Sequence, residues 1–380
     1  MPGLLIVAAV LAMLVYGMIS AMLGTILPEL SARFSLTPRQ NGTLATTQAL
    51  GLMLASIGVG PVLDDFGQKI GIVFGLAVIA VVLLGLPRSG GFRSIAWMFF
   101  LLGVGGGTVT TGINALVSEV DGTHRAVALT LVNIFFGLGG LATPFLSANL
   151  LGRNWVRLCH TIAWLAFGCV AIQAAVPAAP ANHAGRFLFA DAGAVLVRPE
   201  LFLLGAFMFL YVGCEVGIWN WLVRHLMTQG IPEGRALNIL SLGFALGLLL
   251  GRLAVSAVLL RVPSIDVTLA ASIAMTVVTF AMVRSRSPSA AWVLVFLTGL
   301  AMAPVFPTTL AMTGDAFPRM SSTAIGFVVT CGWAGLAASS RLIGGIAGGD
   351  ARRLRQALLV IPASSAVMIA VNLGIRAAMR

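Results

Sequence analysis

A series of twelve long apolar stretches, each nearly free of charge, dominates this sequence. The hydrocarbon core of a bilayer is about 30 Å thick, and a helix needs about 20 apolar residues to cross it. The fold class is therefore an all-α membrane protein. We predict spans near 3–28, 41–63, 70–87, 95–118, 125–150, 157–178, 199–223, 235–260, 264–283, 290–313, 322–347 and 355–376.

Composition excludes a soluble protein, because only 9% of the 380 residues are charged and 59% are hydrophobic. Soluble domains carry roughly 25% charged residues. The net charge of +11 does not indicate nucleic-acid binding. Its arginines cluster at the ends of the spans, where they anchor helices at lipid headgroups, and Lys69 is the single lysine.

Cysteine and histidine give no sign of a metal or cofactor. The four cysteines all lie in apolar stretches without a CxxC pair, and the four histidines are scattered singly. The chain also opens almost directly into its first span, without the charged start and small-residue cleavage site of a secretory signal. We expect that span to be retained, no cofactor, and a monomer in the plasma (inner) membrane.

The two halves of the chain repeat each other at a constant shift of 196 residues (103 to 299). Gly103, followed by a segment that ends at Glu119, parallels Gly299 and the segment that ends at Asp315. The same shift superposes three further glycine pairs: Gly17 on Gly213, Gly51 on Gly247, and Gly139 on Gly335. We predict two six-helix bundles, 1–178 and 199–380, joined by a cytoplasmic connector, 179–198. Parallel repeats of this kind are typical of transporters that bind substrate between the halves.

The segment Gly60-Pro-Val-Leu-Asp64-Asp-Phe-Gly67-Gln-Lys69 lies between the second and third spans. Its spacing resembles the signature loop of the major facilitator superfamily, which lies on the cytoplasmic side. Glycines permit a tight turn between packed helices. Asp64 can then face the positive end of a helix dipole, and the span that starts near Ser321 is the expected neighbour. An ordinary polar turn is the alternative interpretation.

Two features conflict with this resemblance. Asp65 and Gln68 occupy positions where the superfamily loop usually has basic residues. With the loop inside, the cytoplasmic side also holds a minority of the 23 basic residues, Arg252 among them. That distribution contradicts the positive-inside rule, so the predicted orientation depends on the loop alone.

Three further stretches resemble the fucose–proton symporter branch of that superfamily. Tyr211–Trp221 is similar to its seventh helix, Gly243–Arg252 to its eighth and Gly299–Thr308 to its tenth. The branch also places acidic residues in its first and fourth helices. Gly24 and Thr110 occupy those positions here, so the usual proton-coupling carboxylates are missing.

Glu215 is the one acid of twelve that falls well inside a predicted span. An acid in hydrocarbon costs several kcal/mol unless it is paired or protonated, and it indicates a functional site. Glu215 lies roughly 24 Å along its helix and Arg341 about 28 Å along the eleventh, so the two charges could meet. The alternatives are a Glu215 that only fixes its helix and an Arg341 that reaches the headgroups.

Polar and aromatic residues on the cavity-type helices suit a hydroxylated solute. Amides and hydroxyls hydrogen-bond its hydroxyl groups, and an aromatic face covers its apolar side. Taken alone, each of these residues fits a role in helix packing better than a ligand contact. The candidates are Gln48, Thr110, Thr111, Asn114, Asn133, Trp219, Asn220, Asn238, Thr308, Thr330 and Trp333.

We therefore expect a secondary transporter that moves a small polar solute, such as a sugar, by alternating access and with protons as a possible second cargo. Efflux of organic compounds, facilitated diffusion and a transport-dead receptor or scaffold remain alternatives, since fold does not fix function. An enzyme is not expected, because the sequence has no HExxH or GxSxG motif. Ala347-Gly-Gly-Asp350 also lacks the leading glycine of a GxGD protease.

Overall fold

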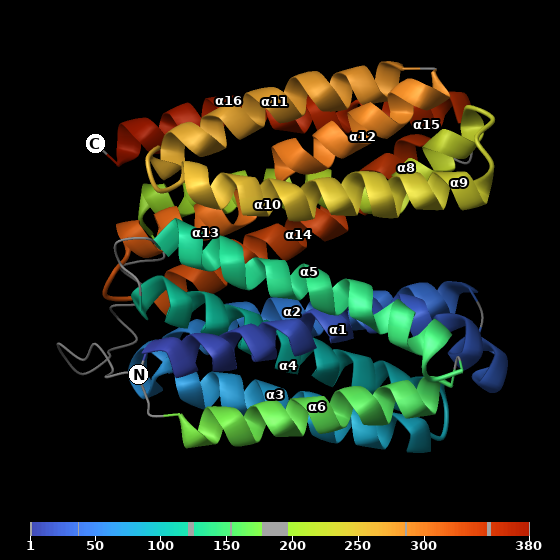
Figure 1. Ribbon diagram of the computed structural model, residues 1–380, viewed down its shortest axis with the longest axis vertical. Helices are drawn as coiled ribbons and strands as arrows, with labels where there is room; N and C mark the ends of the chain where they lie inside the picture. The colour runs from blue at the N-terminus through green and yellow to red at the C-terminus, as the bar shows by residue number, and fades with distance from the viewer. Residues whose placement is uncertain are drawn as a thin grey trace. The chain divides into compact units, whose positions relative to one another are not determined.

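The computed structural model describes residues 2–36, 38–120, 125–152, 154–176, 197–285, 287–347 and 351–379. All regular secondary structure in these ranges is helical (Figure 1). The elements are α1 (Pro2–Phe34), α2 (Pro38–Phe66), α3 (Gln68–Gly85), η1 (Leu86–Arg88), α4 (Phe92–Val120), α5 (Arg125–Asn149), α6 (Trp155–Ala175), α8 (Pro199–Thr228), α9 (Glu233–Asn238), η2 (Ile239–Ala245), α10 (Leu246–Val258), α11 (Ser264–Arg284), α12 (Pro288–Met302), α13 (Val305–Ala316), α14 (Ser321–Ala347), α15 (Ala351–Leu358) and α16 (Val360–Ala378).

Twelve helical segments of the described chain are long and apolar enough to cross a membrane. They run from Ile6–Leu27 to Arg353–Ala378, and each overlaps one predicted span. The all-α membrane fold is therefore confirmed. Residues 179–196 of the predicted connector lie outside the described residues.

The chain divides into two compact units. The first contains Met1–Arg125, Val132–Leu196 and Phe317–Thr330, and the second contains Ala126–Leu131, Val197–Ala316 and Cys331–Arg380. Helix α14 is divided between Thr330 and Cys331, and residues Ala126–Leu131 of α5 are counted with the second unit. Residues 126–131 correspond to 322–327 under the shift of 196 residues.

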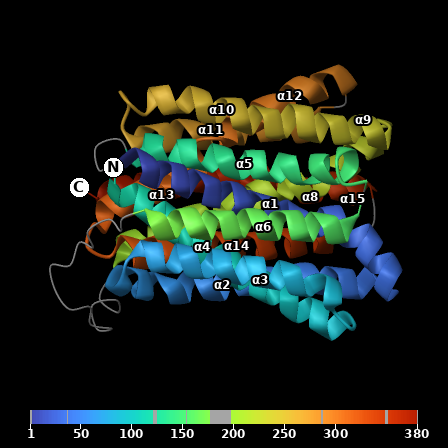
Figure 2. The same ribbon diagram turned by 60° about the horizontal axis from the view of Figure 1, so that its bottom comes forward.

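In the first unit, α4 packs against α2 and α3, and α3 also lies along α6 (Figures 1 and 2). The α2–α4 contact depends on two glycines. A Cβ at Gly51 would overlap the carbonyl oxygen of Phe100, and one at Gly103 would overlap that of Gln48. Small residues let membrane helices approach this closely.

The second unit repeats this contact between its own helices. Gly247 meets the carbonyl oxygen of Phe296, and Gly299 meets that of Phe244. These two glycines and the two residues whose carbonyl oxygens they meet each correspond, under the shift of 196 residues, to the residues of the same contacts in the first unit. The helices themselves differ, however, because the eighth span contains the π-helical turn η2 and the tenth breaks at Ala303–Pro304.

Candidate functional site

Asp64 lies in the last turn of α2, next to the first turn of α14 and within the first unit. Its Oδ1 accepts the backbone N–H of Ser322 at 3.0 Å. Its Oδ2 accepts the N–H of Thr323 at 2.9 Å and the hydroxyl of Thr323 at 2.5 Å. The first N–H groups of a helix have no partner inside the helix, and the N-terminus favours negative charge. Asp64 therefore caps α14, which is the contact that the sequence led us to expect.

Gly60 makes this contact possible. A Cβ at Gly60 would lie 2.6 Å from the Cα of Thr323 and 2.8 Å from the carbonyl oxygen of Ser322. Any larger residue would push α14 away from α2 and from Asp64. Farther along α14, Gly326 approaches the carbonyl oxygen of Ser56, and the Thr330 hydroxyl donates to the carbonyl of Met53 at 3.3 Å.

A second carboxylate, Glu119 at the end of α4, reaches the same helix start. The hydroxyl of Ser321 donates to its Oε1 at 2.5 Å, and the amide of Gln68 donates to the same oxygen at 2.9 Å. Gln68 also lies 3.4 Å from the hydroxyl of Ser322. The sequence analysis noted Gln68 as a departure from the family pattern and gave Glu119 no role. We call Asp64, Gln68, Glu119 and Ser321–Thr323 the α14 cap cluster.

Gly67, which lies between α2 and α3, and Lys69, in the first turn of α3, do not join this cluster. Gly67 has a φ of 86°, in the left-handed region that favours glycine. The Lys69 ammonium donates to the carbonyl oxygens of Ala174 at 3.1 Å and Val176 at 2.5 Å. A cation at these carbonyls stabilises the C-terminal end of α6.

Buried amides link α4 and α5 in the first unit. The Asn114 amide donates to the backbone oxygen of Thr110 at 2.7 Å, and the Asn133 amide donates to the side-chain oxygen of Asn114 at 3.2 Å. Tyr16 is also buried, and its hydroxyl has no direct hydrogen-bond partner among the described residues. Three predicted cavity residues therefore lie together. Gln48 and Thr111 are buried in this unit as well.

Glu215 lies half-buried on α8 in the second unit, within the candidate span Pro199–Thr228. One helical turn earlier, the Tyr211 side chain is completely buried. Both Glu215 and Arg252 of α10 act electrostatically on the Tyr211 hydroxyl. Only 7% of Arg252 is exposed, and it lies inside the candidate span Ile239–Val258. This finding corrects its assignment to the cytoplasmic side.

Arg341 does not take the role suggested by its depth. The side of α14 that faces α8 carries Gly335, Ser339 and Ile343. Arg341 is two positions from Ser339, or about 200° around the helix. It is exposed, and no ion pair joins it to Glu215 in the described part of the chain. The pairing of these two charges therefore has no support in the structure.

The other predicted cavity residues of the second unit are dispersed. The Trp219 ring packs edge-on against Phe244, with ring centroids 5.2 Å apart and an interplanar angle of 77°. Asn220 and Asn238 are exposed, whereas Thr308 is fully buried. The indole nitrogen of Trp333 and the hydroxyl of Thr308 have no hydrogen-bond partner among the described residues. In the same ranges, no group of three His, Cys, Asp or Glu side chains could hold a metal ion.

Comparisons with known proteins agree with this fold. The sequence profile of the Major Facilitator Superfamily matches residues 9–349. The chain is 22% identical over 341 residues to the TsgA homolog of Erwinia tasmaniensis, covering 84% of this chain and 82% of that protein. It is 23% identical over 309 residues to the glucose/mannose transporter GlcP of Bacillus subtilis, covering 78% and 76%.

Among solved structures, the chain is similar to FucP, the fucose:proton symporter of Escherichia coli, in its outward conformation. The TM-score is 0.84 at 16% identity, over 97% of this chain and 98% of FucP. This identity supports a shared fold and no finer conclusion. Together with the profile match over most of its length, the twelve spans show that this chain belongs to the Major Facilitator Superfamily as a multi-pass membrane transporter.

Proposed function

We propose that this transporter moves a small hydroxylated solute, such as a sugar, by alternating access and couples this movement to protons through Glu215. Glu215 carries the proposal, because it is an acid inside a candidate span and lies one helical turn from the buried Tyr211, on whose hydroxyl it acts electrostatically. Ionisable residues in such positions mark substrate or proton pathways in transporters. We further propose a monomer in the plasma (inner) membrane.

The neutral amide network supports a hydroxylated solute. Thr110, Asn114 and Asn133 present hydroxyl and amide groups that can exchange hydrogen bonds with the hydroxyls of a sugar. GlcP, a relative that aligns over most of the chain, is named a glucose/mannose transporter. A coupling role for Asp64, as a contact that forms in one transport state and breaks in another, is part of the same proposal.

Purified protein in liposomes tests this function. Labelled glucose and mannose should accumulate against their gradient when the outside is made acidic, and Glu215→Gln should abolish accumulation while downhill exchange continues. Arg341→Gln is the matched control, because that side chain is exposed on α14. Accumulation by Glu215→Gln at the wild-type level would exclude Glu215 as the proton carrier. Equilibration without accumulation in the wild type would indicate a uniporter, and outward pumping would indicate an exporter.

A further inference from the structure

We propose that His225 is a pH-sensitive switch, and that its protonation releases the end of α8 from the end of α11. Under the predicted orientation, both helix ends lie on the outer side of the membrane, so acid outside favours their separation. The inference goes beyond the proposed function and does not depend on Glu215.

Two polar contacts join these helix ends within the second unit. His225 lies in the last turn of α8, Gln229 directly follows that helix, and Ser285 directly follows α11. The side-chain nitrogen of Gln229 lies 2.9 Å from Nε2 of His225 and donates to the carbonyl oxygen of Ser285 at 3.3 Å. We call this arrangement the His225–Gln229–Ser285 bridge.

The bridge requires a neutral His225. A carbonyl oxygen can only accept, so the Gln229 atom that faces Ser285 is the NH₂ group. Because that group only donates, Nε2 of His225 accepts from it, and the single ring proton is on Nδ1. His225 is 1% exposed, and its Nδ1 has no hydrogen-bond partner in the described part of the chain.

A second proton on His225 is incompatible with the bridge. An N–H at Nε2 would face the NH₂ group of Gln229, donor against donor. If the Gln229 amide turned to accept from Nε2, its oxygen would face the carbonyl oxygen of Ser285, acceptor against acceptor. Either arrangement leaves buried polar groups without partners, which is costly. Protonation of His225 therefore breaks the contact with Ser285.

Arg355 of α15 adds a positive charge at the same place. Its Nε donates to the carbonyl oxygen of Val283 at 3.0 Å, and a terminal nitrogen donates to that of Arg284 at 2.5 Å. Its charge also acts on His225. A protonated His225 is then a second cation beside this guanidinium, and the two charges repel each other. Repulsion and the lost hydrogen bond thus both favour release.

Arginine predominates among the other charged residues on the neighbouring helix ends. The guanidinium of Arg224 lies over the Trp221 ring, and that of Arg284 lies over the Phe280 ring. Added positive charge on His225 therefore meets repulsion more than attraction. The remaining members of this set are Glu233, Arg235, Arg352 and Arg353.

The direction of the pH dependence follows from the number of bound protons. The bridged form has no proton on Nε2, whereas an imidazole freed from the bridge titrates near its usual pKa of about 6.5. The ratio of released to bridged protein should be constant at high pH and rise as the pH falls below about 6.5. Between about pH 7.5 and about pH 5, the rise should reach up to about 30-fold.

Hydrogen–deuterium exchange of the full-length protein in detergent tests this inference at the backbone amides of 226–231 and 281–285. The wild type is compared with His225→Gln at each pH, because acid slows intrinsic exchange equally in both. Glutamine keeps an acceptor near the position of Nε2 but does not titrate. The two should exchange alike at about pH 7.5, and the wild type should exchange up to about 30-fold faster at about pH 5. His160→Gln, at a partly exposed histidine of α6, is the matched control and should respond to pH like the wild type.

Gln229→Ala supplies a second test, because it removes the bridge and leaves His225 in place. This variant should exchange faster than the wild type at about pH 7.5, and the difference should shrink as the pH falls. That comparison also decides the matter if His225→Gln does not fold. The same pH response in the wild type and in His225→Gln would overturn the inference. A difference between the wild type and Gln229→Ala that does not change with pH would overturn it as well.

Discussion

The α2–α4 pair of the first unit and the η2/α10–α12 pair of the second have the same contacts but different chemistry. Gly51 and Gly103 meet the backbone of the opposite helix in one pair, and Gly247 and Gly299 do so in the other. The contact atoms correspond as well, since Phe100 and Gln48 become Phe296 and Phe244 under the same shift. Glycine thus preserves the backbone approach while the surrounding side chains diverge.

The divergence occurs in the shape and charge of the helices. Thr108 lies inside the continuous α4, whereas its counterpart Pro304 lies at the break between α12 and α13. Proline has no N–H to donate to the carbonyl four residues earlier. Ser56, which is buried and neutral, corresponds to the buried cation Arg252. At these corresponding positions, the second unit therefore has a broken helix and a buried charge, whereas the first has a continuous helix and neutral side chains.

This comparison supports the proposal that the two units have different roles in transport. A regular helix satisfies its own backbone and holds neutral side chains in hydrocarbon at little cost, whereas an intramembrane charge needs compensation. We infer that the second unit couples transport to protons and that the first unit binds the hydroxyl groups of the solute. The following substitutions test that division.

We expect the largest effect from Arg252→Leu, because we propose that Arg252 and Glu215, which both act on the Tyr211 hydroxyl, balance each other's charge. Breaking a buried pair from one side costs about 3–5 kcal/mol, more than replacing both members by apolar groups. Arg252→Leu should therefore be less stable than the double change Glu215→Leu with Arg252→Leu, as measured by thermal unfolding in detergent. At the counterpart position in the first unit, Ser56→Ala should cost much less, because the buried Ser56 hydroxyl has no hydrogen-bond partner among the described residues. Additive losses in the cycle would show that the two charges do not interact.

Valine at the repeated glycines tests whether the two pairs are equivalent in packing. Gly51→Val and Gly247→Val would each place side-chain atoms against a backbone carbonyl of the opposite helix. Overpacking costs typically about 1–3 kcal/mol, so both variants should lose a similar share of monodisperse protein in size-exclusion chromatography. Gly58→Val is the matched control on α2, because nothing lies within 4 Å of a Cβ there. Tolerance of valine at one glycine alone would mean that the two contacts are not equivalent.

The α14 cap cluster should show a smaller and graded effect. Asp64 accepts two backbone N–H groups, whereas Glu119 accepts only side-chain donors from Gln68 and Ser321. Asp64→Asn should therefore destabilise the start of α14 by about 1–2 kcal/mol, and Glu119→Gln by less. Hydrogen–deuterium exchange at the backbone amides of Ser322 and Thr323 measures this destabilisation directly. Faster exchange in Glu119→Gln than in Asp64→Asn would assign the main capping role to Glu119.

Sequence reasoning predicts the features that depend on position along a helix. The twelve spans follow from the length of apolar stretches, and the repeated glycine contacts follow from a constant shift. The Asp64 contact follows from a loop spacing and a helix start at the same membrane side. Each of these predictions depends only on the spacing of residues along the chain.

Features that depend on which side of a helix a residue occupies were not predicted from the sequence. Arg341 has the right depth to meet Glu215, but its side chain leaves α14 on the side away from α8. Arg252 was expected on the cytoplasmic side, although it is buried inside a candidate span at a glycine contact. An arginine within a leucine-rich stretch, directly after Gly251, is a signal that could have identified it. The π turn leaves no signature that we could detect.

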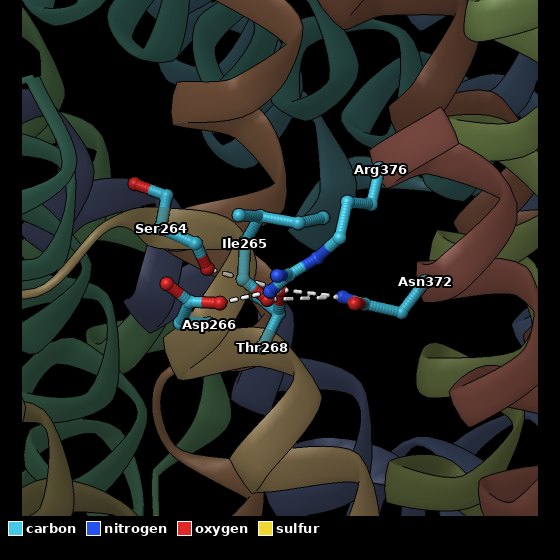
Figure 3. Close-up of polar contacts among 6 residues, drawn as sticks. All are labelled: Ser264, Ile265, Asp266, Thr268, Asn372 and Arg376. Atoms are coloured by element: carbon cyan, nitrogen blue, oxygen red, sulfur yellow. Dashed lines mark hydrogen bonds and ion pairs between the residues drawn. The ribbon is translucent and has the colours of Figure 1, made fainter. Parts of the chain in front are cut away.

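The smallest effect should come from substitutions of the charged residues that join the third and sixth spans of each half at corresponding helix ends. Lys69, at the start of α3, donates to carbonyls at the end of α6, and Arg376, near the end of α16, pairs with Asp266 at the start of α11 (Figure 3). These are the third and sixth spans of each half. In the second unit, Asn372 adds a buried bond to the Thr268 hydroxyl at 2.8 Å.

The Arg376 and Asp266 side chains are 33% and 42% exposed, so solvent and salt screen their attraction. Exposed pairs contribute about 0–1 kcal/mol, and a cation at a helix C-terminus contributes about 0.3–1 kcal/mol. Asp266→Asn and Lys69→Gln should therefore each lower the free energy of unfolding by less than about 1 kcal/mol. The Asp266→Asn loss should shrink further in high salt. Asn372→Ala should cost more than Asp266→Asn, because it removes a buried hydrogen bond to Thr268. A loss for Asp266→Asn that exceeds the loss for Asn372→Ala would mean that the ion pair, rather than the buried amide, holds α11 to α16.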